Sequence, residues 1–282
     1  MSEPWTASVE KRSDVVTESA ARALNDLLDR SLAAPVTGDP LPLLWHWLAF
    51  LPQAAQSTIG ADGHPIPGEF LPPMGGRVRM YAGGRIAVRG TPRVGQLLER
   101  TSLVTAVTSK KGRSGELLFV TVEHSAQSVT GSIDDRNDIV YREPGLPARD
   151  SSTPVDIDDG WSWGRTVEID PPLLFRFSAL TYNAHRIHYD RDYATKVEGY
   201  PGLVVHGPLQ AMLLADAIER VAPTRTVTEF EFRSIAPAFD ADPVSIRLRH
   251  DLEPDSLELA AFSAGKQTMT ARAQLATDGS PS

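Results

Sequence analysis

The chain has 282 residues, of which 41% are hydrophobic and 23% charged, a composition typical of a folded protein and too apolar for a disordered one. At roughly 100–200 residues per domain, this length predicts two domains or one large one. The 28 basic and 36 acidic residues give a formal net charge of −8, which argues against a surface built to bind nucleic acid or an anionic membrane. Cysteine is absent, which excludes disulfides, thiolate metal sites and a cysteine nucleophile and favours a reducing compartment, the cytoplasm.

Residues 1–14 contain Glu3, Glu10 and Asp14 and no apolar run, so we expect neither a secretory signal nor a transit peptide there. The most apolar stretch, residues 41–52, is much shorter than the roughly 20 residues that a membrane-spanning helix needs. We therefore expect a protein that has no membrane partner.

The first half begins with an amphipathic helix over residues 17–32, for which Thr17 or Ser13 can provide the N-cap. Its apolar residues at helical spacing are Ala20, Ala23, Leu24, Leu27, Leu28 and Leu32. Residues 34–95 are rich in Pro and Gly, so we expect long connections there, broken by short elements.

Two β-branched runs predict a hairpin in the later part of this half. They read LLERTSLVTAVTSK and ELLFVTVEHSAQSV, and KGRSG separates them, with Gly112 and Gly115 supplying the turn. Residues 143–160 have the Pro, Ser and Asp content of a linker. We place a domain boundary near residue 155.

The second half contains one strongly apolar helix after Gly207, with Pro208 in its first turn and Pro223 at its end. Apolar residues lie almost all round this helix, so we expect it to be buried on most sides. A short strand at 163–169 and a helical or irregular segment at 171–190 precede it. Four strand-like runs follow, at 226–235, 244–253, 256–264 and 268–276. A buried helix followed by an antiparallel meander predicts an α+β fold in which the sheet wraps the helix.

Histidine is the most informative residue type, because three of the seven histidines, His185, His188 and His206, lie close together in the sequence. His185 and His188 could share a helical face as metal ligands. However, the sequence has no further histidine at a spacing typical of a metal motif, and Arg186 between them would repel a cation. A Gly-x-Ser-x-Gly nucleophile motif is also absent. Acid–base chemistry, without a metal or a cofactor, is the remaining interpretation.

The segment FSALTYNAHRIHYDRDYATKVEGYPGLVVHGPLQAMLLAD resembles the catalytic segment of the MaoC-like, or (R)-specific, enoyl-thioester hydratases and dehydratases. That family places Asp and His five residues apart in S-G-D-x-N-P-[LIV]-H, followed by His-Gly at the start of the central helix. Here the matching positions are Asn183 and His188, and then His206 and Gly207. Asn183 replaces the usual Asp, His185 the usual Asn and Arg186 the usual Pro.

The variant NAHRIHYD is similar to the branch that contains type 2 hydroxyacyl-thioester dehydratases and mesaconyl-C4-CoA hydratases. The phrases DGHPIPGEFLPP, RMYAGG and KKGRSGELLFVTVEH extend this resemblance into the first half, so that it covers most of the chain from about Trp45 onward. The resemblance implies a double hot-dog fold, with a degenerate, substrate-binding domain at 1–155 and a domain with the catalytic loop at 156–282. It also implies one active site per chain.

The implied reaction is the reversible hydration of a 2-enoyl thioester, or the dehydration of a 3-hydroxyacyl thioester. We assign His188 as the principal acid or base, Asn183 as a hydrogen-bonding residue that orients water or substrate, and His185 as a second proton-transfer group. Enolate stabilisation would come from the backbone at Gly207, at the start of the helix, with His206 beside it.

Each assignment has a structural alternative. His185 could face solvent beside Arg186, and Asn183 could form an Asx turn or a helix cap. His206 could orient the loop without touching substrate, and Gly207 could be an ordinary helix cap.

A CoA or carrier-protein arm carries phosphate, which an acidic protein must bind with local basic residues. The candidates are Arg77, Arg79, Arg85, Arg89, Lys110, Lys111 and Arg113, for each of which solvated surface charge is the alternative. A dicarboxylic substrate would also need an arginine in the pocket. A homodimer is a further expectation, and a non-catalytic thioester-binding protein and a hot-dog thioesterase stay open as other functions.

Overall fold

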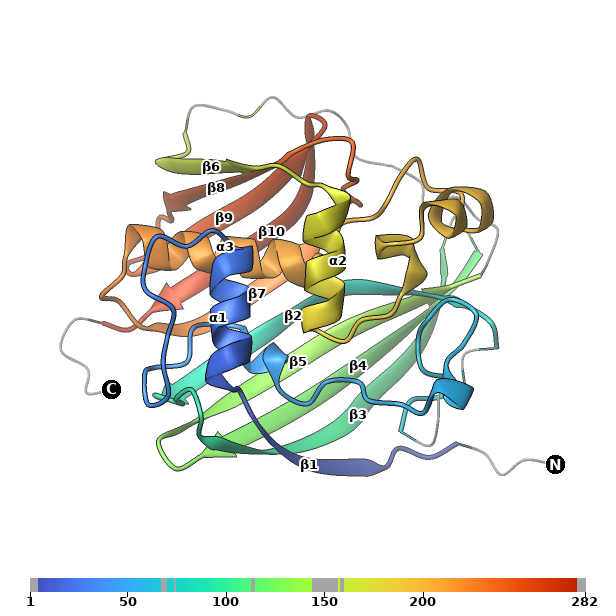
Figure 1. Cartoon of the computed structure of the whole chain (residues 1–282), viewed down its shortest axis with the longest axis horizontal. Helices are drawn as coiled ribbons and strands as arrows, with labels where there is room; N and C mark the ends of the chain where they lie inside the picture. Colours follow the sequence, from blue (N-terminus) through green and yellow to red (C-terminus); the bar gives the residue numbers. More distant parts are fainter. Residues whose placement is uncertain are drawn as a thin grey trace.

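The computed structural model describes residues 5–66, 70–73, 75–112, 115–143, 157 and 160–277. Ten antiparallel strands form one continuous sheet in the order β1-β3-β4-β5-β2-β7-β10-β9-β8-β6 (Figure 1). The strands are β1 (Val9–Val15), β2 (Val78–Gly90), β3 (Leu97–Gly112), β4 (Gly115–Ser128), β5 (Gly131–Arg142), β6 (Trp163–Val167), β7 (Val227–Ser234), β8 (Val244–His250), β9 (Ser256–Ser263) and β10 (Lys266–Leu275).

Three α-helices and four short helical turns complete the described part of the chain. They are α1 (Glu18–Leu27), η1 (Trp45–Leu48), η2 (Gln56–Thr58), α2 (Pro171–Leu180), η3 (Arg186–His188), η4 (Tyr193–Val197) and α3 (Gly207–Val221). None of these helices is long and apolar enough to cross a membrane.

The helix α3 confirms the sequence prediction. It begins at Gly207, Pro208 lies in its first turn, and most of its residues are buried, since it packs against β8, β9 and β10. The helix α1 also forms, with the Thr17 side chain accepting the Ala20 N–H. It ends at Leu27 rather than near residue 32, because Asp29 takes a positive φ of 49°, which a right-handed helix cannot continue through.

The strand β2 was not predicted, since residues 34–95 were expected to be mainly connections. Its glycines are needed because strands approach closely there. A Cβ at Gly83 would lie 2.4 Å from the Phe232 carbonyl oxygen, and one at Gly84 would lie 2.5 Å from that of Arg136. Glycine within this strand therefore marks tight strand packing rather than a break.

The two halves of the chain meet where β2 pairs with β7, from Gly83 opposite Arg233 to Ala87 opposite Glu229. Strands β1 to β5 lie on one side of this seam and β6 to β10 on the other. The proposed boundary near residue 155 and most of the expected linker lie outside the described residues. The division into domains at 1–155 and 156–282 therefore stays a prediction.

The predicted hairpin is confirmed as the pair β3 and β4, with Gly112 opposite Gly115. In the second half, β8, β9 and β10 pair in sequence order, but the expectation of a simple meander is wrong for β7. That strand pairs with β10 on one edge and with β2 on the other, because it joins the two halves of the sheet.

Candidate active site

A cavity of about 1260 Å³ opens between the two halves of the chain. The first half contributes residues near η1, the loop that contains His64, and residues 79–82 of β2. The second half contributes the segment from Thr181 to His188 and the start of α3. This volume exceeds the roughly 300–1,000 Å³ of usual small-molecule sites, so the cavity can hold an acyl group together with part of a long carrier arm.

His188 lines this cavity and has a defined orientation. Its Nδ1 lies 2.7 Å from the Val204 carbonyl oxygen, which can only accept, so Nδ1 carries the hydrogen and Nε2 presents a lone pair. Burial lowers the pKa of His188 to about 4, because a charged imidazolium would lose its hydration. A neutral, oriented imidazole of this kind is suited to accept a proton.

Three further histidine rings lie next to His188, one on one side and two in succession on the other. His206 stacks on it with ring centroids 3.7 Å apart, and His185 meets it edge to face at 5.4 Å. His64 in turn lies 4.1 Å from the ring of His185. The structure therefore brings together all three histidines that the sequence singled out, and adds a fourth from the first half of the chain.

His206 and His185 are both buried, but only His185 lines the cavity. The Nε2 of His206 lies 2.8 Å from the Ser178 hydroxyl, which favours a role in orienting His188. The Nε2 of His185 has no hydrogen-bond partner among the described residues, and burial holds the pKa of this group at about 2. The alternative in which His185 faces solvent is wrong, since the residue is only 4% exposed.

Asn183 lines the cavity, and its Oδ1 accepts the backbone N–H of His185 at 3.0 Å. This is the Asx turn that the sequence left open as an alternative. The side-chain Nδ2 is the group that Asn183 has left for a substrate or a water molecule. Gly207 also lines the cavity, and a Cβ there would lie 3.2 Å from Cδ1 of Tyr81, so the start of α3 presents bare backbone.

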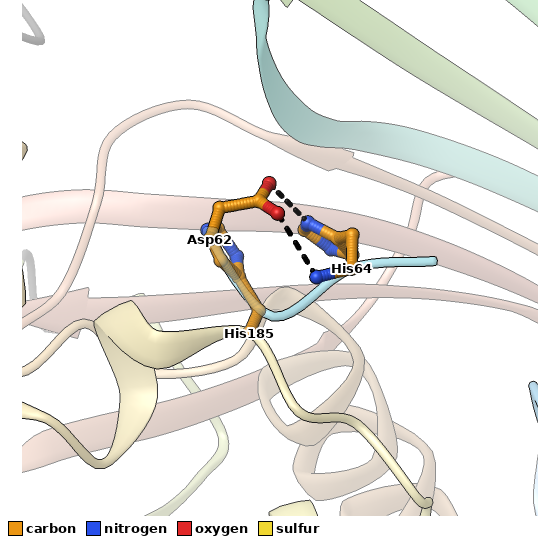
Figure 2. A group of neighbouring side chains, drawn as sticks. All are labelled: Asp62, His64 and His185. Carbon is orange, nitrogen blue, oxygen red and sulfur yellow. Dashed lines mark hydrogen bonds and ion pairs between the residues drawn. The ribbon is translucent and has the colours of Figure 1, made fainter. Parts of the chain in front are cut away.

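Sequence reasoning missed Asp62 and His64, which reach the site from the first half (Figure 2). The Oδ2 of Asp62 lies 2.9 Å from Nδ1 of His64, and its Oδ1 accepts the His64 backbone N–H at 3.0 Å. The phrase Asp62-Gly63-His64 contributed to the family resemblance, but it lies far from His185 in the sequence, so the contact between His64 and His185 could not be predicted. The signal in the sequence is a histidine within a Gly- and Pro-rich loop.

The pKa values of this pair reflect their contact. Burial tends to raise the pKa of Asp62, but the hydrogen bond and charge of His64 outweigh it and bring the pKa down to about 2. Burial lowers the pKa of His64, an effect that the hydrogen bond to Asp62 opposes and the nearby positive charge of Arg79 reinforces.

The donor atoms of Asp62, His64 and His185 lie within 4.8 Å of one another, a spacing that could hold a cation. The charge of Arg79 lowers the pKa of both histidines, so a cation there would meet an existing positive charge. We therefore assign no metal to this group.

Of the three foremost arginine candidates, only Arg79 reaches the cavity. Arg77 pairs with Glu116 at 2.9 Å, and Arg85 is exposed and pairs with Glu229 at 2.7 Å.

The other basic candidates that the structure describes also lie outside the cavity. Arg89 is exposed and pairs with Asp134, Lys110 lies over the Phe119 ring, and Lys111 is exposed. Arg113 lies outside the described residues. Two cavity arginines that the sequence analysis did not select are Arg12 and Arg100.

The model of the family described as hydroxyacyl-thioester dehydratase type 2 matches residues 44–240. The chain is 46% identical over 258 residues to the mesaconyl-C(4)-CoA hydratase of Chloroflexus aurantiacus, covering 90% of this chain and 91% of that protein. It is also 40% identical over 100 residues to the mitochondrial hydroxyacyl-thioester dehydratase type 2 of Schizosaccharomyces pombe, covering 31% of this chain and 33% of that protein.

Solved structures confirm the fold. A MaoC-like dehydratase from Phytophthora capsici superposes with a TM-score of 0.67 at 11% identity, covering 98% of this chain and 97% of that one. A Mycobacterium tuberculosis protein described as having a double hot-dog fold superposes with a TM-score of 0.59 at 14% identity, covering 97% and 96%. The α+β double hot-dog fold predicted from the sequence is confirmed.

Proposed function

Because the chain belongs to the hydroxyacyl-thioester dehydratase type 2 family, we propose that it adds water to 2-enoyl thioesters, and removes it from 3-hydroxyacyl thioesters, with His188 as principal proton-transfer group. The chain is a hydro-lyase of acyl thioesters. The observation that supports the role of His188 is its fixed tautomer in a cavity that both halves line. His185 and Asn183 lie beside it and complete the group expected from the sequence.

Hydration requires a base for water and a site for the negative charge that develops on the thioester oxygen. The Nε2 of His188 would accept a proton as the water oxygen bonds to the β-carbon. The Gly207 N–H, at the positive end of α3, would donate to the enolate oxygen, since Pro208 has no N–H to offer. Nδ2 of Asn183 would hold the water or the product hydroxyl.

The substrate that we propose is a CoA thioester whose short acyl group carries a carboxylate. The relative from Chloroflexus aurantiacus is named for mesaconyl-C(4)-CoA, which is a substrate of this kind. Arg79 supports the proposal, because it lines the cavity, whereas Arg77 and Arg85 lie outside it and pair with Glu116 and Glu229. Its positive charge lowers the pKa of His64 and of His185, which line the same cavity. The cytoplasmic location and the homodimer expected from the sequence stay predictions.

The test is hydration of crotonyl-CoA and mesaconyl-C4-CoA, followed by the loss of absorbance of the enoyl thioester. His188→Gln is expected to lower kcat by about 10²–10⁴-fold, the usual contribution of a general base. His250→Gln, at an exposed position on β8, is the matched control and keeps the wild-type rate. Full activity of His188→Gln would contradict the assignment of this residue. Free-thiol release by wild type without hydration would contradict the reaction itself.

A further inference from the structure

We propose that His64, oriented by Asp62, is the second proton-transfer group of this active site and delivers the proton that the α-carbon gains during hydration. The inference rests on the proposed function, because it adds a residue to the same reaction. Asn183 stands where the resemblance leads one to expect an ionisable Asp, and an amide does not exchange a proton at neutral pH. The acid for this reaction must therefore come from elsewhere. His185, which the sequence suggested for this role, has no hydrogen-bond partner at Nε2 among the described residues, and burial holds its pKa at about 2, whereas His64 has the carboxylate of Asp62 at its ring.

The contacts of His64 define which of its nitrogens is available. The carboxylate of Asp62 binds the ring at Nδ1 and the backbone N–H of the same residue, as Figure 2 shows. This arrangement keeps a hydrogen on Nδ1 and leaves Nε2 to exchange a proton. An Asp that orients a histidine in this way also stabilises its protonated form.

The loop that carries His64 is built onto the segment that carries His188. The backbone N–H of Arg186 donates to the Asp62 carbonyl oxygen at 2.8 Å, and its guanidinium donates to that of Ala61 at 3.0 Å. A Cβ at Gly63 would lie 1.8 Å from the Ala184 carbonyl oxygen, so only glycine permits this approach. The two halves thus place both histidines at one cavity in a fixed relation.

The surroundings of the two histidines differ in the way that an acid and a base require. His64 has a carboxylate partner, whereas His188 has only the neutral carbonyl of Val204. Burial lowers the pKa of both, but Asp62 opposes that change at His64 alone. His64 is therefore the better proton donor and His188 the better acceptor. The positive charge of Arg79 lowers the pKa of His64, and His185 lowers the pKa of Asp62. The charge of Asp62 in turn raises the pKa of Tyr141 and of Glu198.

The proposed step is balanced. As the water oxygen bonds to the β-carbon, one water proton moves to Nε2 of His188 and the electron pair of the double bond moves to form the enolate. The enolate collapses as its α-carbon takes the proton from Nε2 of the protonated form of His64, which the Asp62 carboxylate favours against the effect of burial. His188 then releases its proton to solvent and His64 gains one, which restores the starting state. Dehydration runs through the same steps in reverse.

The experiment compares wild type with His64→Gln, Asp62→Asn and the exposed-site control His250→Gln. His64→Gln is expected to lower kcat for hydration by about 10²-fold or more, with a smaller change in KM, since a general acid contributes about 10²–10⁴. In deuterated water, His64→Gln should also slow the exchange of the α-hydrogen of the 3-hydroxyacyl thioester for deuterium. Thermal unfolding checks that each variant is folded.

The variant Asp62→Asn distinguishes a role of His64 in proton transfer from a purely structural role. It also provides a second test if His64→Gln fails to fold. Loss of the carboxylate lowers the pKa of His64, so the alkaline limb of the kcat profile for hydration should move to lower pH. A retained rate in folded His64→Gln, or an unmoved limb in Asp62→Asn, would overturn the inference. So would loss of wild-type activity on chelation with recovery on adding Zn²⁺. Failure of the proposed function is distinct, since wild type would then hydrate neither thioester.

Discussion

The imidazole ring of His206 lies almost parallel to that of His188, with ring centroids 3.7 Å apart and planes inclined by 20°. Val204 fixes the rotation of His188 through its carbonyl oxygen, and His206 covers one face of the ring. His206 is itself held by the Ser178 hydroxyl on α2. A pair of hydrogen bonds to neighbouring elements therefore determines where Nε2 of His188 points.

Ser178→Ala tests this support. The substitution removes the hydrogen bond to a fully buried histidine and leaves Nε2 of His206 without a partner, at a cost of about 1–3 kcal/mol in the free energy of unfolding. We also expect kcat to fall while KM changes little, because the orientation of His188 loosens. The control is Ser245→Ala, which removes an exposed contact with Thr166. Equal free energies of unfolding for the two variants would contradict the prediction.

The buried histidines predict a loss of stability in mild acid. Burial lowers the pKa of His188 and of His124 from the ordinary value of 6.5 to about 4 in each case. The unfolded chain therefore binds these protons at a higher pH than the folded protein does. The contribution of these two neutral histidines to the free energy of unfolding is fully present above about pH 6.5. It declines as the pH falls from there toward about 4.

Urea denaturation at about pH 7 and about pH 5 measures this decline, and His188→Gln should make it smaller because one of the titrating groups is removed. His250→Gln, on the exposed part of β8, should leave the decline unchanged. A decline that is the same in wild type and His188→Gln would show that His188 does not contribute.

The sequence was sufficient to predict α3, because its apolar residues lie all round the helix and glycine and proline define its start. It was not sufficient for β2, since Gly83 and Gly84 look like breaks until the neighbouring strands are seen to lie against them. Local patterns thus predict elements whose residues contact sequence neighbours. They fail where the reason for a residue lies on a strand far away in the chain.

The site divides in the same way. His188, His185 and His206 were identified because they are near one another in sequence and match a family motif. His64 and Asp62 come from a Pro- and Gly-rich loop of the other half, and only the fold places that loop on the segment before His188. Among the arginines, the sequence offered no means of separating Arg79 from those that pair with surface carboxylates.

The docking of this loop is tested by Gly63→Ala against Gly38→Ala. Both glycines have a positive φ, 94° and 97°, so both substitutions carry a similar backbone strain of about 1 kcal/mol. Only the Cβ at position 63 collides, at 1.8 Å from the Ala184 carbonyl oxygen, whereas nothing lies within 4 Å of one at position 38. Gly63→Ala should therefore lose most of its hydratase activity, and Gly38→Ala should keep it. Similar activities in the two variants would show that the loop tolerates displacement.

Arg79 provides the test of substrate class. A guanidinium that binds a substrate carboxylate contributes about 1.5–3 kcal/mol, so its loss should raise KM by about 10- to 100-fold. Arg79→Gln should produce this change for mesaconyl-C4-CoA and leave KM for crotonyl-CoA, which has no such carboxylate, near that of wild type. For mesaconyl-C4-CoA, the KM of Arg79→Lys should fall between those of wild type and Arg79→Gln, because lysine keeps the charge but not the paired donors.

The matched control is Arg85→Gln, on the same strand, where the arginine is exposed and pairs with Glu229 outside the cavity. It should change KM for neither thioester. If Arg79→Gln raised KM for both thioesters equally, the arginine would bind a part that they share, and the CoA phosphates are the anionic groups common to both. If it changed neither, the assignment of a substrate carboxylate to Arg79 would be wrong.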